Sequence, residues 1–170
     1  MSPVVPPAVA TAALADAEAA VAEYDGAIAW FSGQMGSYRT PIAVEVWVLD
    51  PTLTRVLLVE HRWRGWVPPG GKAEPAEMPR AAAARELREE TGLSVDLLRR
   101  PAAAMVRAYH PDWPRALGLT YAAIADPAAP LVAEPGQPVA WRSLDEPWAS
   151  SFPNDIERIR NYVAWSVRRS

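Results

Sequence analysis

Apolar and polar positions alternate along PIAVEVWVLD (residues 41–50), and the stretch is rich in β-branched residues. This pattern predicts a strand. RVLLVEHR (55–62) predicts a second strand, which follows a turn at Asp50-Pro51. Later apolar stretches predict three more strands, around residues 102–109, 117–125 and 138–142.

Three other stretches favour helices. Residues 9–24 are alanine-rich and have high helix propensity up to Asp25-Gly26. A second helix is predicted from Pro79, which suits a first helical turn, to Gly92, which suits the position after the last turn. The last is predicted at 153–168, with four apolar residues on one face: Ile156, Ile159, Val163 and Val167. Mixed strands with two or three helices predict an α/β (α+β) sandwich.

The length of 170 residues suits one domain with a proper core. We predict two parts. Residues 1–40 form an N-terminal extension, a proline-containing tail followed by the alanine-rich helix, and residues 41–170 form the main domain. Two roles stay open for the extension: covering the core, or supporting a homodimer contact.

The composition limits the kinds of partner that the protein is expected to bind. The net charge of −3 provides no broad basic surface, so we expect no stable nucleic-acid complex. The absence of cysteine excludes disulfides, thiolate zinc sites and a cysteine nucleophile, and it fits a cytoplasmic protein. No apolar run approaches the roughly 18 residues of a membrane span. The first twenty residues lack the basic region of a signal peptide, so we expect no membrane association.

Three carboxylates, Glu86, Glu89 and Glu90, lie within five residues of the helix predicted to start at Pro79. Like charges at such spacings repel by roughly 0.2–0.5 kcal/mol per pair on an exposed helix. A hard divalent cation such as Mg²⁺ binds clustered carboxylate oxygens and would remove this repulsion. Arg85 could orient one of the glutamates. The plainer interpretation is a solvated charged face.

The surrounding residues have a fixed spacing. Gly71 is followed after five residues by Glu77, after seven more by Arg85-Glu86-Leu87, and then by Glu89-Glu90 and Gly92-Leu93. Seven fixed residues would match by chance about once in 10⁸ positions at average residue usage. The segment 71–93 resembles a complete Nudix box, the signature of the Nudix hydrolases.

This resemblance implies the Nudix fold, an α/β/α sandwich around a mixed sheet in which the box forms a loop, a helix and a loop. It also implies hydrolysis, dependent on Mg²⁺ or Mn²⁺, of a nucleoside diphosphate linked to another moiety. The implied metal ligands are Glu86, Glu89, Glu90 and the Gly71 carbonyl, with Glu86 also the candidate general base. Glu77, Arg85 and Gly92 are implied to support the catalytic loop and helix.

Outside the box, residues 134–159 are similar to MutT-type pyrophosphohydrolases. The shared positions are Gly136-Gln137-Pro138, Trp141, Ser143-Leu144 and Phe152-Pro153. This similarity implies cleavage of a nucleoside triphosphate, with oxidised purines such as 8-oxo-dGTP among the candidates, to nucleoside monophosphate and pyrophosphate. It implies Glu134 as a further metal ligand, and Asn154 and Asp155 as readers of the purine edge. The last two residues equally suit a helix cap.

Two cations are candidates for binding substrate phosphates: Arg62 at the end of a strand and Lys72 beside Gly71. Other hypotheses stay open. The substrate could be a dinucleoside polyphosphate, an RNA 5′ end or a specialised-metabolite diphosphate, although the acidic balance disfavours RNA. The domain could also sense nucleotides without catalysis, or the acidic helix could be purely structural.

Overall fold

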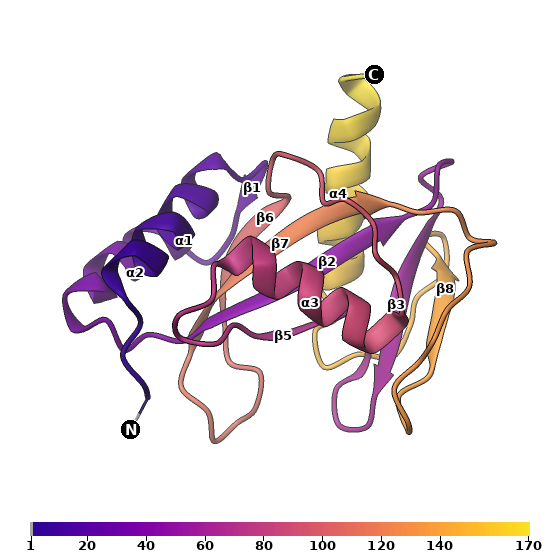
Figure 1. Cartoon of the computed structure of the whole chain (residues 1–170). Helices are drawn as coiled ribbons and strands as arrows, with labels where there is room; N and C mark the ends of the chain where they lie inside the picture. The colour runs from indigo at the N-terminus through magenta and orange to yellow at the C-terminus, as the bar shows by residue number, and fades with distance from the viewer. Residues whose placement is uncertain (1) are drawn as a thin grey trace.

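A mixed β-sheet forms the centre of the structure, a computed structural model that describes residues 2–170 (Figure 1). The strand order is β1-β6-β7-β2-β3-β4, with β5 paired to β2 and β8 paired to β3. The β2–β7 and β1–β6 pairs are parallel and the others are antiparallel. The strands are β1 (Ala22–Glu23), β2 (Ile42–Leu49), β3 (Arg55–His61), β4 (Gly65–Val67), β5 (Gly70–Lys72), β6 (Ala103–Arg107), β7 (Ala116–Ile124) and β8 (Val139–Ser143).

Helices cover both faces of this sheet. On one face lie α1 (Pro7–Ala19), α2 (Ala27–Gln34) with the short 3₁₀ turn η1 (Met35–Ser37), and α3 (Pro79–Thr91). On the other face lies α4 (Asp155–Arg168). The predicted α/β sandwich around a mixed sheet is therefore confirmed.

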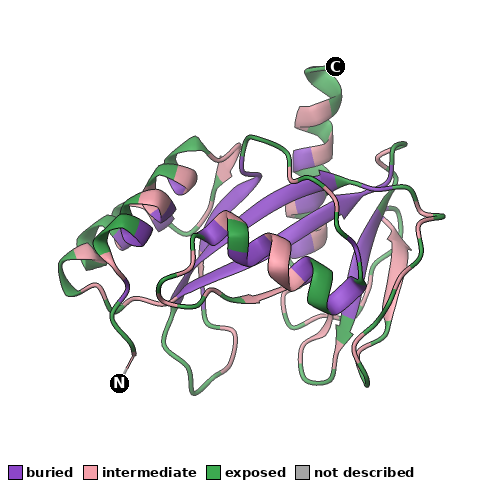
Figure 2. Cartoon of the chain, viewed as in Figure 1, coloured by how far each residue is buried: buried purple, intermediate pink, exposed green. Residues whose placement is uncertain are grey.

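Strand β2 supplies side chains to both cores, and all eight of its residues are buried (Figure 2). Val44 and Val46 pack in the core beneath α1 and α3. Trp47 and Leu49 pack in the core beneath α4. Because side chains alternate between the two faces of a strand, Glu45 projects toward the α4 face.

The first predicted helix was too long, and one helix was missed. The chain leaves α1 at Ala19 because Val21 and Tyr24 donate backbone hydrogen bonds to Pro101 and Ala104, which adds β1 to the edge of the sheet. The missed helix, α2, buries Ala27 and Phe31, one turn apart. The predicted tail also contributes to the core, since Val5 is buried there.

The predicted apolar face of the last helix was partly wrong. Ile159 is fully buried, but the side chain of Val167 is 58% exposed. The buried face of α4 instead includes Asp155 and Tyr162. The reason is that the C-terminal end of α4 extends beyond the edge of the sheet (Figure 1). Among the described residues, no helix combines the length and apolar character that a membrane crossing needs.

Candidate active site

The segment 71–93 folds as a loop, a helix and a loop, as predicted. It begins in β5, which pairs with β2, and continues into α3, whose first residue is Pro79. The helix ends at Gly92, which adopts φ 77°, and the Gly92 amide donates to the Arg88 carbonyl at 2.9 Å. Ala83 and Leu87 are buried against the sheet. This packing fixes which face of α3 carries the glutamates.

Arg85 lies at the centre of the acidic cluster and donates hydrogen bonds to its carboxylates. Its Nε and Nη2 donate to the two carboxylate oxygens of Glu77 at 2.8 and 2.9 Å. Its Nη1 donates to Glu86 at 2.9 Å and to Glu89 at 3.2 Å. The hydrogen bonds from Arg85 lower the pKa of Glu77. Glu77 and Arg85 thus join the loop to the helix.

Glu90 and Glu86 lie in an enclosed setting that disfavours their charged forms. Glu90 is 9% exposed, and its Oε1 accepts a hydrogen bond from the Gly70 amide at 3.0 Å. Burial, followed by the nearby charges of Glu86 and Glu134, raises the pKa of Glu90 to about 8. Burial also raises the pKa of Glu86, and repulsion from neighbouring carboxylates adds to it. A Cβ added to Gly71 would lie 2.7 Å from the carboxyl carbon of Glu86, so only glycine permits this close approach.

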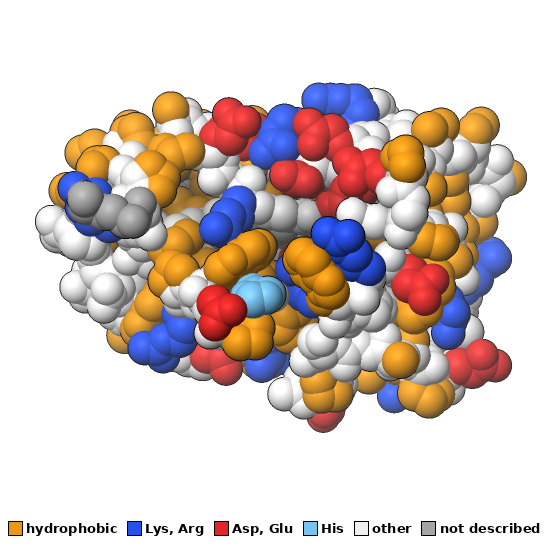
Figure 3. Space-filling view, turned by 90° about the horizontal axis from the view of Figure 1, so that it is seen from below, with side chains coloured by type: hydrophobic (Ala, Val, Ile, Leu, Met, Phe, Trp, Pro, Cys, Tyr) orange, Lys and Arg blue, Asp and Glu red, His pale blue; other side chains and the backbone are white. Residues whose placement is uncertain are grey.

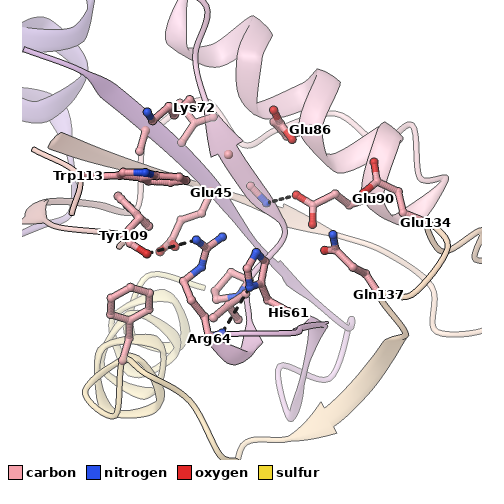
Figure 4. Close-up of a pocket in the computed structure, with 17 residues that line it drawn as sticks. Glu45, His61, Arg64, Lys72, Glu86, Glu90, Tyr109, Trp113, Glu134 and Gln137 are labelled. Carbon is pink, nitrogen blue, oxygen red and sulfur yellow. Dashed lines mark hydrogen bonds between the residues drawn. The ribbon is translucent and has the colours of Figure 1, made fainter. Parts of the chain in front are cut away.

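These carboxylates border a cavity of about 230 Å³ (Figure 4). Across residues 2–170, no three histidine, aspartate or glutamate side chains converge closely enough to hold a metal ion as they stand. Ion binding would therefore draw the glutamates together from these positions. The lining residues are Ala43, Val44, Glu45, His61, Arg64, Val67, Pro68, Gly70, Gly71, Lys72, Glu86, Glu90, Tyr109, Trp113, Glu134, Gln137 and Phe152.

The opening has two different sides. Figure 3 shows acidic side chains gathered along one side of a hollow, and hydrophobic side chains with a histidine along the other. In Figure 4, Glu86, Glu90 and Glu134 lie at one end of the cavity, and Trp113 and Tyr109 lie at the opposite end. The cavity is thus acidic at one end and aromatic at the other.

Two cations and a histidine lie between these ends. Lys72 places its Nζ 4.4 Å from the centre of the Trp113 ring. Arg64 donates through Nη1 to the Tyr109 carbonyl at 3.3 Å. The Nδ1 atom of His61 accepts from the backbone amides of Trp63 and Arg64, and burial lowers the pKa of this histidine. The His61 ring is therefore neutral near pH 7, with its proton on Nε2.

The cavity brings together five of the predicted site residues: Gly71, Lys72, Glu86, Glu90 and Glu134. Glu89 lies beside it with a side chain that is 49% exposed. Three predicted substrate-binding residues are not part of the lining: Arg62, Asn154 and Asp155. The guanidinium carbon of Arg62 lies 4.4 Å from the centre of the Trp63 ring.

Asp155 and Asn154 differ from each other at the start of α4. Asp155 is 1% exposed and accepts a hydrogen bond from Arg107 at 2.7 Å. Asn154 occupies the N-cap position, is exposed, and makes no side-chain capping hydrogen bond. The ion pair therefore turns Asp155 into the protein interior, while Asn154 faces solvent.

The sequence analysis assigned no site role to several polar and aromatic lining residues, among them Glu45, Arg64, Tyr109 and Phe152. One signal was available, because Glu45 is the single charge inside the apolar run IAVEVWVL. Buried charges in strands need a partner or a function. The others come from loops whose proximity only the folded chain creates.

Comparison with known proteins agrees with this architecture. The protein-family model described as the NUDIX domain matches residues 39–165 of this chain. A curated relative from Bacillus subtilis (strain 168), named "Putative 8-oxo-dGTP diphosphatase YtkD", is 48% identical over 54 residues. That match covers 32% of this chain, and the chain spans about a third (34%) of the relative's length.

Solved structures share the fold. A NUDIX-family hydrolase from Clostridium perfringens aligns with a TM-score of 0.62 and 20% identity, over 74% of this chain and 97% of that one. A MutT protein from Methanosarcina mazei Go1 aligns with a TM-score of 0.60 and 18% identity, over 75% and 95% of the two chains. Together, the box geometry, the sandwich and the match over residues 39–165 confirm the resemblance: the chain belongs to the Nudix hydrolase family.

Proposed function

We propose that this protein is a pyrophosphohydrolase that depends on a divalent cation, Mg²⁺ or Mn²⁺, and cleaves nucleoside triphosphates to nucleoside monophosphate and pyrophosphate. Oxidised purine triphosphates such as 8-oxo-dGTP are among its candidate substrates. The observation that carries the proposal is the gathering of Glu86, Glu90 and Glu134 at one end of a cavity that also contains Lys72 and Arg64. The name of the Bacillus subtilis relative supports the same substrate class.

The donor chemistry of the acidic end fits a hard divalent cation. Carboxylate and backbone carbonyl oxygens are the ligands that Mg²⁺ prefers. The candidate ligands are the carboxylates of Glu86, Glu89, Glu90 and Glu134 and the Gly71 carbonyl. Burial and mutual repulsion raise the pKa values of Glu86 and Glu90, so their negative charge lacks sufficient compensation from the protein. A cation would supply that compensation.

When bound, the cation neutralises phosphate oxygens and makes the attacking water more acidic. The residues of the chain then have separate tasks. Lys72 and Arg64 border the cavity where they can bind the phosphate chain. The Gly70 amide fixes the orientation of Glu90, and Arg85 fixes that of Glu86.

Hydrolysis requires one proton transfer at the start. The water oxygen forms a bond to a phosphorus of the α–β linkage, and the bond from that phosphorus to the bridging oxygen breaks. Glu86 accepts the water proton as general base.

The test is a panel of nucleoside triphosphates, dinucleoside polyphosphates and nucleotide sugars, incubated with Mg²⁺ and with EDTA. We expect release of pyrophosphate and nucleoside monophosphate from triphosphates with Mg²⁺, and none with EDTA. Nucleotide binding without release of any product would contradict the proposal and favour a sensing domain. Faster cleavage of a dinucleoside polyphosphate than of every triphosphate would contradict the proposed substrate class.

A further inference from the structure

The cavity extends to both faces of the sheet. At its acidic end, Glu86 and Glu90 come from α3, which packs on one face of the sheet. Glu45 projects to the other face, the side on which Trp47 packs against α4. In Figure 4, Glu45 lies between the three glutamates and the aromatic residues Tyr109 and Trp113. A substrate with phosphates at the acidic end would thus bring its base toward Glu45.

Glu45 has unused hydrogen-bonding capacity in this position. Its Oε1 accepts from the Thr120 hydroxyl at 2.9 Å. Its Oε2 lies 4.0 Å from Nη1 of Arg107, which is beyond hydrogen-bonding distance. Arg107 instead donates to Asp155 at 2.7 Å. A carboxylate accepts several hydrogen bonds, so Glu45 can take further donors from the cavity that it lines.

The surroundings of Glu45 suit a planar heteroaromatic ring. Tyr109 and Phe152 both line the cavity, with ring centroids 5.7 Å apart and an edge-to-face angle of 71°. The Arg107 guanidinium lies 4.0 Å from the centre of the Phe152 ring and packs on it. Trp113 lines the same cavity and remains 41% exposed. Aromatic walls stack bases without distinguishing them, whereas a polar group among them does distinguish.

We propose that Glu45 is a specificity-determining residue that hydrogen-bonds the edge of the nucleobase and selects guanine-type bases. The inference rests on the proposed function, in that it assigns the base end of the same cavity. It also assigns recognition of the base to a residue of β2, instead of to Asn154 and Asp155 at the start of α4.

Guanine-type bases fit Glu45 in either protonation state. An ionised carboxylate can accept from both N1–H and the 2-amino group. A neutral carboxyl can donate to O6 and accept from N1–H. Adenine forms two hydrogen bonds with the neutral form only, because its N1 is an acceptor and only its 6-amino group can donate to the ionised form. Burial raises the pKa of Glu45 to about 7, so both forms are relevant near neutral pH, and guanine is the base matched in each.

The test compares kcat/KM for dGTP, dITP and dATP in the wild type and in Glu45→Gln. We expect the wild type to prefer dGTP, with dITP intermediate because it lacks the 2-amino group. Glu45→Gln should reduce the preference for dGTP over dATP by about tenfold, chiefly through KM. The matched control is Glu60→Gln, the same change at an exposed residue of the neighbouring strand β3. An unchanged preference in Glu45→Gln would overturn the inference.

Binding of the products dGMP and dAMP, measured by calorimetry, separates this inference from the proposed function. If no triphosphate is hydrolysed but dGMP binds more tightly than dAMP only when Glu45 is present, the proposed function fails and the inference stands. If triphosphates are hydrolysed and both monophosphates bind equally, the inference fails alone. Should Glu45→Gln not fold, Glu45→Asp keeps the charge beside Arg107 and withdraws the carboxyl by one methylene. It should lose the same preference.

Discussion

Two arginine-centred clusters lie on opposite faces of the sheet and differ in their access to water. In the first, Arg85 has a side chain that is 24% exposed and contacts Glu77, Glu86 and Glu89. In the second, Arg107 is 8% exposed and lies between Asp155, which it hydrogen-bonds, and Glu45. Each cluster contains more carboxylates than arginines.

The difference in access separates their roles. Around Arg85, the surplus carboxylates border a cavity, so a ligand can compensate their charge. Around Arg107, the pair that Arg107 forms with Asp155 is enclosed between β6 and α4, so each of these two charges depends on its partner within the protein, while Glu45 also lines the cavity. Buried ion pairs contribute little net stability when intact, but the loss of one partner leaves an uncompensated charge that is costly. We therefore expect the first cluster to control activity, and the second to control stability and, through Glu45, base selection.

The largest effect should come from Arg107→Met. This change leaves Asp155 and Glu45 buried without a cation, and we expect a loss of about 3–5 kcal/mol in the free energy of unfolding. Urea unfolding followed by tryptophan fluorescence measures it. The control is Arg55→Met, since Arg55 is 47% exposed and its pair with Asp50 spans 3.7 Å. Asp50 is buried, but it keeps hydrogen bonds from the backbone amides of Thr54 and Arg55 at 2.9 and 2.8 Å, so that loss should stay within about 1 kcal/mol. Equal losses in both variants would contradict the distinction.

Glu90→Gln should separate activity from stability in the other cluster. We expect kcat to fall at least about a hundredfold, because a metal ligand contributes several kcal/mol of charge stabilisation. The fold should be kept, since burial already disfavours the charged form of Glu90. Activity and melting temperature are measured together, with Glu18→Gln on the exposed face of α1 as the control. Near-wild-type turnover would refute the ligand role. Glu89→Gln is expected to act in the same direction.

The pH dependence of stability should identify the enclosed carboxyl. Burial raises the pKa of Glu45 from 4.5 to about 7 in the folded protein. Below pH 4.5 the group is neutral in both states, and its stabilising contribution is complete. Between pH 4.5 and 7 the unfolded chain releases a proton that the folded protein retains, so the free energy of unfolding falls as pH rises.

Urea titrations of the wild type and Glu45→Gln across pH 4–8 isolate this contribution, because the other carboxyl groups are common to both proteins. The wild type should lose stability relative to Glu45→Gln through that window. Parallel curves would show that Glu45 keeps an ordinary pKa.

The smallest effect should come from Asn154→Ala. Asn154 is exposed, lies outside the cavity lining and makes no side-chain capping hydrogen bond. We expect changes below about twofold in KM for purine triphosphates and below about 0.5 kcal/mol in stability, as for an ordinary surface position. A selective rise in KM for purine substrates would return the base-reading role to the start of α4 and count against Glu45.

Sequence alone determined the features that depend on near neighbours along the chain. Pro79 and Gly92 predicted the start and the end of α3, because helix capping acts over a few residues. The supporting role of Glu77 and Arg85 was implied only by the resemblance to the Nudix box. It also located the glutamates that the cavity brings together. Alternation in residues 41–50 predicted β2, and further apolar stretches predicted β3 and the three later strands.

Only the tertiary structure decided which distant residues meet. Residues 22–23 became a strand because β6, about eighty residues later, offered an unpaired edge, and this pairing overrode the helix propensity of the alanine-rich segment. Asp155 turned inward because Arg107 on β6 lay within reach. Glu45 lines the cavity because β2 pairs with β5, which places Glu45 opposite Gly70. Ion pairs and cavities depend on side chains that converge from separate elements, and local spacing carries no information about that convergence.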